Sequence, residues 1–327
     1  MVKIRSLGYA GFGAPKPEVW LQYATDIIGL MPARACAGED WGMPAVSAPG
    51  PASGGSGIAE DGSVYLKLDE WQWRIGIHPS EDNHGLLYLG LEVDDQFALE
   101  AAVGELKAAG CEAQIGSEGQ ARARAVTGIA FTRDPMGNAV ELFYGPTVDH
   151  KFVSPRGMRF VTGELGLGHL NLLAAPLEEA RHFYTRILGF RLTDYIRFGE
   201  TDSANFFHCN RRHHSLGLLR VGELKGIHHM MLEVTSVDMV LQCLDRVRDA
   251  GITVTASMGR HVNDHMLSFY MRSPFGFEVE IGCEGRLLDE RWTPNAFVEG
   301  DLWGHRGLDP ETINENLEGL ARRKEGV

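Results

Sequence analysis

The sequence contains an internal repeat, and such a repeat predicts two halves with the same architecture. Leu7–Tyr9 near the N-terminus matches Leu167–His169 in the second half, and each is followed by a helix-like run that ends at a glycine. Tyr88–Val93 matches His229–Val234 in the same way. The second match keeps one offset through the helix and the turn that follow it. We therefore interpret the chain as a duplication.

The two copies differ at the positions where the second copy has metal-binding side chains. His169 and His229 stand where the first copy has tyrosines. A third match, between 134–141 and 273–280, ends in a glutamate in both copies, and this residue is Glu280 in the second. A lone strand histidine is usually a hydrogen-bonded core residue, but two histidines and one carboxylate form the ligand set of non-haem Fe(II) oxygen enzymes. The repeat thus favours a metal site in the second half.

Each copy has the pattern of two smaller units in which strands surround a helix. Leu86–Val93 is typical of a strand. The runs from 95 to 109 and from 236 to 250 are typical of helices, since Asp95 and Ser236 can cap their N-termini and a glycine follows each C-terminus. The three candidate metal ligands lie in strand-like runs, where alternation lets each side chain point to one face.

These units predict how the domains divide the chain. We expect a first domain without metal over 1–150, a metal-binding domain over 160–290 and a C-terminal extension over 291–327. Gly42–Ser63 is rich in glycine, serine, proline and alanine, which predicts an irregular loop.

Charge, cysteine content and hydropathy exclude several classes of protein. A formal net charge of −13 argues against a nucleic-acid partner, which favours a basic face. The 5 cysteines are scattered and form no CxxC pair, which is typical of reduced thiols in a cytoplasmic protein. We find no signal peptide and no apolar run of the ~20 residues that a membrane helix needs.

Further polar side chains cluster in the second half. Most of the 13 histidines lie between 169 and 265, and this crowding favours a site. The candidates, beyond the three metal ligands, are His213, His214, His261, Asp264, His265 and Tyr270. Phe206, Phe207 and the apolar side chains around Leu170 and Met231 are candidates for the wall of an aromatic pocket, and packing in the core explains them equally well.

At these residues the chain resembles the type I extradiol ring-cleavage dioxygenases of the vicinal oxygen chelate superfamily. It is most similar to the two-domain 2,3-dihydroxybiphenyl 1,2-dioxygenase branch, over residues 3–290. The family signature runs from a histidine through an aromatic–Tyr pair and a Pro-x-Gly turn to a glutamate. Here these are His261, Phe269–Tyr270, Pro274–Gly276 and Glu280. Further matches are Leu167–His169, Arg212–Leu216 and His228–Val234, and Ser273 is a departure from the signature.

The resemblance implies an α+β fold of four βαβββ modules paired into two barrel-like domains. It implies that His169, His229 and Glu280 hold Fe(II), and that the substrates are a catechol and O2. The product would be a ring-opened hydroxy-oxo-dienoate of aromatic-compound catabolism. The family also implies a homo-oligomer. In the doublet at 228–229 we choose His229, because it keeps register with Tyr88.

The resemblance also implies roles for the surrounding residues. His214, chosen over its neighbour His213, would accept a proton from the catechol. Tyr270 and His261 would hydrogen-bond the catechol oxygen on the metal, and Asp264 would orient these groups.

Other functions remain open from the residues alone. A metal-dependent isomerase of the same superfamily would use Zn or Ni, and a ligand-sequestering binding protein would need no iron triad. A hydrolase has little support, since no Gly-x-Ser-x-Gly motif occurs. The ligand set accepts Mn as well as Fe, and the preferred catechol is not legible in the sequence.

Overall fold

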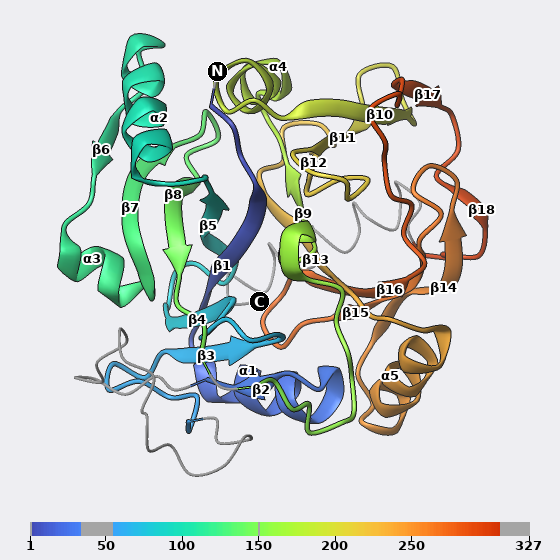
Figure 1. Cartoon of the computed structure of the whole chain (residues 1–327). Coiled ribbons are helices and arrows are strands. Elements are labelled where there is room, and N and C mark those ends of the chain that lie inside the picture. Colours follow the sequence, from blue (N-terminus) through green and yellow to red (C-terminus); the bar gives the residue numbers. More distant parts are fainter. Residues whose placement is uncertain (1, 34–54, 150, 308–327) are drawn as a thin grey trace.

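The computed structural model describes residues 2–33, 55–149 and 151–307, and within them the strands form two sheets (Figure 1). The order of the 8-stranded sheet is β2-β3-β4-β1-β5-β8-β7-β6, and that of the 10-stranded sheet is β17-β10-β11-β12-β9-β13-β16-β15-β14-β18. The strands of the first sheet are β1 (Ser6–Ala14), β2 (Met31–Pro32), β3 (Val64–Lys67), β4 (Ile75–Pro79), β5 (Leu86–Glu92), β6 (Ala113–Ile115), β7 (Val126–Arg133) and β8 (Ala139–Pro146). Those of the second are β9 (His169–Leu173), β10 (Arg191–Arg197), β11 (Ser203–His208), β12 (Leu216–Arg220), β13 (Gly226–Glu233), β14 (Val254–His261), β15 (Leu267–Arg272), β16 (Glu278–Cys283), β17 (Asn295–Phe297) and β18 (Asp301–Trp303).

Both long predicted helices are present, with boundaries one residue inside those expected. The helices are α1 (Pro17–Tyr23), α2 (Gln96–Ala108), α3 (Glu118–Ala123), α4 (Leu177–His182) and α5 (Val237–Asp249). Asp95 caps α2 by accepting a hydrogen bond from the Ala98 backbone N–H. Ser236 occupies the N-cap position of α5 as predicted, but its side chain makes no capping hydrogen bond. Gly110 and Gly251 follow with φ of 81° and 66°, the left-handed conformation that ends a helix. No helix in the described ranges is long and apolar enough to cross a membrane.

The repeat is visible in the pairing of the strands. In the first sheet β1 pairs antiparallel with β5, which pairs parallel with β8. In the second sheet β9 pairs antiparallel with β13, which pairs parallel with β16. A helix follows the first strand of each unit, so the strands β1–β16 form four βαβββ modules. The predicted α+β fold is confirmed, while the domain boundaries stay a prediction.

Only part of the predicted loop at Gly42–Ser63 lies within the described residues. Residues 42–54 lie outside the described residues. Residues 55–63 form no helix or strand, and a single bridge joins Ile58 to Val64.

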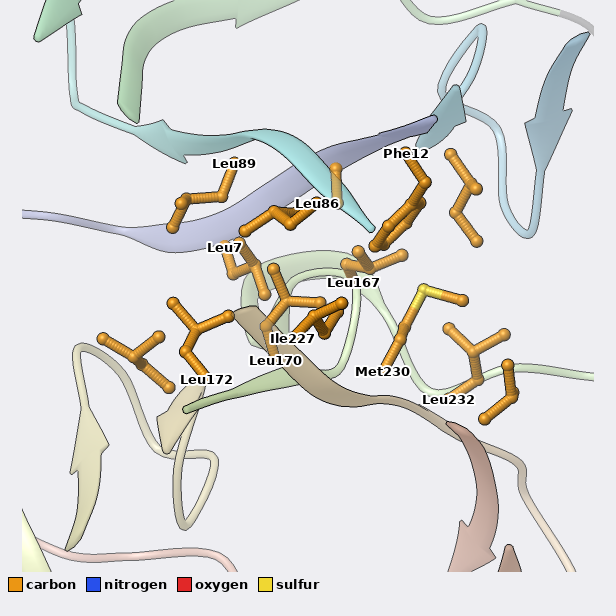
Figure 2. Packing of buried hydrophobic residues seen from close by; sticks show 14 of the residues in the cluster. Leu7, Phe12, Leu86, Leu89, Leu167, Leu170, Leu172, Ile227, Met230 and Leu232 are labelled. Carbon is orange, nitrogen blue, oxygen red and sulfur yellow. The ribbon is translucent and has the colours of Figure 1, made fainter. Parts of the chain in front are cut away.

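The hydrophobic core lies between the two halves, and it packs against one face of the strands of the second half. Leu7 and Leu89, from β1 and β5, face Leu170 and Leu172 of β9 (Figure 2). Because successive side chains of a strand point to opposite faces, burial of the two β9 leucines in this core turns His169 to the other face. The alternation of apolar and polar residues in β9 therefore places a candidate ligand opposite the core.

Candidate metal centre

Three neighbouring strands bring His169, His229 and Glu280 together. Met231 of β13 pairs with His169 of β9 on one side and with Glu280 of β16 on the other. Side chains at paired positions point to the same face of a sheet, and His229 lies two residues before Met231 and shares that face. All three candidate ligands are at most 4% exposed.

The three ligand atoms face one another closely. The Nε2 atoms of His169 and His229 are 2.9 Å apart. The Glu280 Oε2 atom lies 3.3 Å from the former and 3.4 Å from the latter. Ligand atoms that bind one metal at right angles, each about 2.1 Å away, lie about 3 Å apart. The spacing therefore fits three ligands on one face of a metal ion.

The electrostatics of this group also fit a cation. Neither carboxylate oxygen of Glu280 has a hydrogen-bond partner among the described residues, although the side chain is 1% exposed. A buried carboxylate without a partner is costly, and a metal ion removes that cost. Burial lowers the pKa of His229 well below its usual value, which leaves the neutral ring with a lone pair for a metal. Although burial alone raises the pKa of the Glu280 carboxyl, its contacts with His169 and His261 hold that pKa well below its usual range.

The structure separates the members of both histidine doublets. His228 contacts its neighbour through the two Nδ1 atoms, 2.6 Å apart, and only His229 directs Nε2 toward the other two ligands. The Nε2 atom of His213 lies 3.0 Å from the Asp194 carboxylate, which holds that ring away from the ligands.

His214 lies directly beside the three candidate ligands. Its ring stacks on His169 with centroids 4.0 Å apart, and its Nε2 atom has no hydrogen-bond partner among the described residues. Burial lowers its pKa well below the usual value, so the ring is neutral near pH 7. A neutral, unpaired nitrogen at this position can accept a proton from a bound ligand.

Tyr270 and His261 form a second polar group at the site. The Tyr270 hydroxyl lies 2.8 Å from His261 Nε2, and this nitrogen is 3.6 Å from the Glu280 Oε1 atom. Asp264 is brought near His214 but at 3.9 Å it makes no hydrogen bond to that ring. His265 lies outside the cavity and contacts Arg286.

A cavity of about 400 Å³ opens above these groups. The three candidate ligands, together with His214 and Tyr270, form its polar end. Its apolar end consists of Ile196, Phe198, Ala204, Phe206, Leu219 and Val298. Of the four predicted pocket residues only Phe206 lies on this wall, because Phe207 and Leu170 are in the core and Met231 lines a separate, smaller cavity.

Two polar residues of the C-terminal extension also line the cavity, and sequence reasoning missed both. Asp301 and His305 lie on or just after β18, and Asp301 Oδ1 is 2.7 Å from His261 Nδ1. The sequence did contain a signal for this pair, because His305 follows Asp301 by four residues. That signal lies outside the repeat, which selected the other candidates.

The first half has a filled counterpart of this site. The Tyr9 hydroxyl donates to Glu141 over 2.6 Å, and Arg124 donates to both oxygens of that carboxylate. The guanidinium also lies 4.1 Å from the centre of the Tyr88 ring. A cationic side chain thus neutralises in the first half the carboxylate that corresponds to Glu280.

Arg124→Ala should lower the free energy of unfolding by about 3 kcal/mol, because it leaves the buried Glu141 carboxylate without its cation. Arg122→Ala, which removes an exposed arginine of the same segment, should change it by less than about 0.5 kcal/mol. Urea unfolding of the two variants checks this. Equal stabilities would contradict the role of Arg124.

Comparisons with known proteins agree with this geometry. A family profile described as the Glyoxalase/Bleomycin resistance protein/Dioxygenase superfamily matches residues 166–281. An iron-dependent extradiol dioxygenase of Rhodococcus jostii (strain RHA1) is 35% identical over 93% of this chain and 97% of its own length. A biphenyl-2,3-diol 1,2-dioxygenase of Paraburkholderia xenovorans (strain LB400) is 35% identical over 96% of this chain and 99% of its own. The crystal structure of a halotolerant catechol dioxygenase superimposes with a TM-score of 0.84 at 32% identity, covering 95% of this chain and 97% of that one.

Proposed function

Because the chain belongs to the extradiol dioxygenases of the glyoxalase/bleomycin resistance protein/dioxygenase superfamily, we propose that it cleaves 2,3-dihydroxybiphenyl or a similar bicyclic catechol. The enzyme is an extradiol catechol dioxygenase, an oxidoreductase that inserts both atoms of O2 beside the diol. The observation that supports the proposal most is the group of three ligand atoms within 2.9–3.4 Å at the polar end of a cavity of about 400 Å³. The comparisons favour this activity over the isomerase and the sequestering protein.

In this proposal His169, His229 and Glu280 hold one Fe(II). When bound, the metal lowers the pKa of the catechol hydroxyls and gathers the diol and O2 at its open positions. The orphaned carboxylate of Glu280 and the neutral ring of His229 are the observations that support these residues as ligands.

The surrounding side chains handle protons and orient the diol. His214 would accept a proton from a catechol hydroxyl through its unpaired Nε2 atom. Tyr270, in contact with His261, would donate its hydroxyl hydrogen to a diol oxygen and hold the ring in one orientation. Asp264 would act on these groups through its charge, since its carboxylate accepts the Met266 N–H over 2.9 Å and lies 3.9 Å from His214 Nδ1 without a hydrogen bond.

The apolar end of the cavity supports a substrate with a second ring. Catechol alone leaves this end unfilled, whereas a phenyl substituent beside the diol reaches it and is removed from water. Ala204 lies on this wall between Ile196 and Leu219.

Ala204→Phe should therefore lower kcat/KM for 2,3-dihydroxybiphenyl by about 10- to 100-fold, since the larger side chain occupies the space of the distal ring. The value for unsubstituted catechol should change by less than about threefold. Steady-state assays with both substrates check this. An equal loss on both would contradict the placement of the distal ring.

The function is tested by anaerobic reconstitution with Fe(II), followed by a panel of catechols in air. A yellow ring-opened product from 2,3-dihydroxybiphenyl supports the proposal. Binding of the diol without product, or activity only with Zn or Ni, would contradict it. Reconstitution with Mn in parallel decides between the two metals that this ligand set accepts.

The oligomeric state and the cellular location of the protein are also proposals. We expect a homo-oligomer on the resemblance, and light scattering of the purified protein tests this. A cytoplasmic location is supported by Cys111, Cys209, Cys243 and Cys283, which are free thiols among the described residues.

A further inference from the structure

The segment after β16 passes across the open side of the second sheet. β17 pairs with β10 at one edge of that sheet, and β18 pairs with β14 at the other edge (Figure 1). Between the two strands, Val298 and Gly300 line the cavity. Residues 291–307 of the C-terminal extension therefore join both edges of the sheet and lie across the mouth of the site.

Specific contacts hold this segment in place. The Trp292 indole N–H donates to the Thr193 carbonyl over 2.8 Å, and the Val262 N–H donates to the Gly300 carbonyl over 3.0 Å. Gly304 has a φ of 82°, and a Cβ atom there would lie 2.2 Å from a backbone oxygen of β14. Only glycine permits this close approach, so Gly304 fixes the position of β18 relative to β14.

The carboxylate of Asp301, on β18, contacts two histidines. Asp301 Oδ1 is 2.7 Å from His261 Nδ1 and 2.6 Å from His305 Nδ1. A carboxylate only accepts hydrogen bonds, so both Nδ1 atoms donate. His305 is itself held in place, since its Nε2 atom lies 3.1 Å from Ser268 Oγ and its ring centroid lies 4.1 Å from that of His261.

This arrangement decides which nitrogen of His261 faces the site. Because Nδ1 donates to Asp301, the opposite nitrogen of the ring, Nε2, is turned toward the Tyr270 hydroxyl, 2.8 Å away. The ring plane is fixed at the same time by the bond to Asp301. Without that acceptor the imidazole is free to turn away from the tyrosine.

We propose that Asp301 is a positioning residue for ring cleavage, which fixes the ring plane of His261 and, through it, the position of the Tyr270 hydroxyl. The inference deepens the proposed function and rests on it. Carboxylates that orient an imidazole in this way commonly change activity by about 10- to 100-fold when they are removed.

The test uses the full-length enzyme loaded with Fe(II). Asp301→Ala should lower kcat by about 10- to 100-fold and change KM for the diol by less than about threefold. Asp301→Asn keeps an accepting oxygen, so its kcat should fall by only about 3- to 10-fold. Glu299→Gln removes an exposed carboxylate of the same segment and should leave kcat unchanged. Iron content and the anaerobic dissociation constant for catechol should match the wild-type values in all three.

A double-mutant cycle with His261→Gln identifies the route of the effect. In that background Asp301→Ala should lower kcat by less than a further factor of about two, because the residue acts through the missing imidazole. Independent, multiplying losses would overturn the proposal, as would a loss explained by missing iron. If Asp301→Ala does not fold, wild-type kcat in Asp301→Asn overturns it. An inactive wild-type enzyme would instead refute the proposed function.

Discussion

His229→Ala should remove iron and ring cleavage together. Its Nε2 atom is one of three that face a common point, 2.9 Å from His169 Nε2 and 3.4 Å from the Glu280 Oε2 atom. Removing it leaves only two of the three ligand atoms. Iron content should fall below about a tenth of an ion per chain, and kcat by more than about 10³-fold, because the metal brings both substrates together.

His228→Ala is the matched control for this prediction. The two histidines are adjacent and both are buried, but His228 is not part of the group of ligand atoms and contacts His229 through Nδ1. This variant should retain iron near one ion per chain when it is reconstituted with excess Fe(II). Metal analysis after gel filtration measures both variants. Iron lost from the control and kept in His229→Ala would reverse the assignment within the doublet.

His214→Ala should separate metal binding from turnover. The ring stacks on His169 but has no part in the ligand group, and its Nε2 atom is unpaired. Loss of a positioned proton acceptor typically lowers the rate by about 10²- to 10⁴-fold. We therefore expect kcat to fall by this factor, with iron content and anaerobic catechol binding unchanged.

His265→Ala serves as the control for this variant. It removes a histidine of the second half that contacts Arg286 and does not line the cavity. Its kcat should remain within about threefold of the wild-type value, since surface contacts of this kind contribute little. Single-turnover measurements on both variants separate binding from chemistry. A near-normal rate in His214→Ala would exclude it as the proton acceptor.

The repeat made the centre of the site predictable from the sequence. Alignment of the two copies selected His169, His229 and Glu280 from many polar residues, and the strands bring these three together as alternation predicts. Alternation also required Phe206 and Phe207 to point to opposite faces. It left undecided which of the two faces the cavity, because that depends on the packing of the core.

Contacts outside the repeat could not be predicted. Asp301 reaches His261 only because the C-terminal extension crosses the sheet, and no periodic pattern reports such a crossing. Arg124 faces Glu141 from a segment with no distinctive motif. Ser236 occupies the predicted N-cap position of α5 without a side-chain hydrogen bond, since the residue type alone does not ensure that the side chain turns toward the helix.

The most direct measurement is anomalous scattering at the iron edge from crystals of the Fe(II)-loaded enzyme grown without oxygen. We expect one iron atom per chain within bonding distance of His169 Nε2, His229 Nε2 and a carboxylate oxygen of Glu280, with the polar end of the cavity open beside it. Iron bound elsewhere, or these three side chains turned away from a fully loaded metal, would contradict the account.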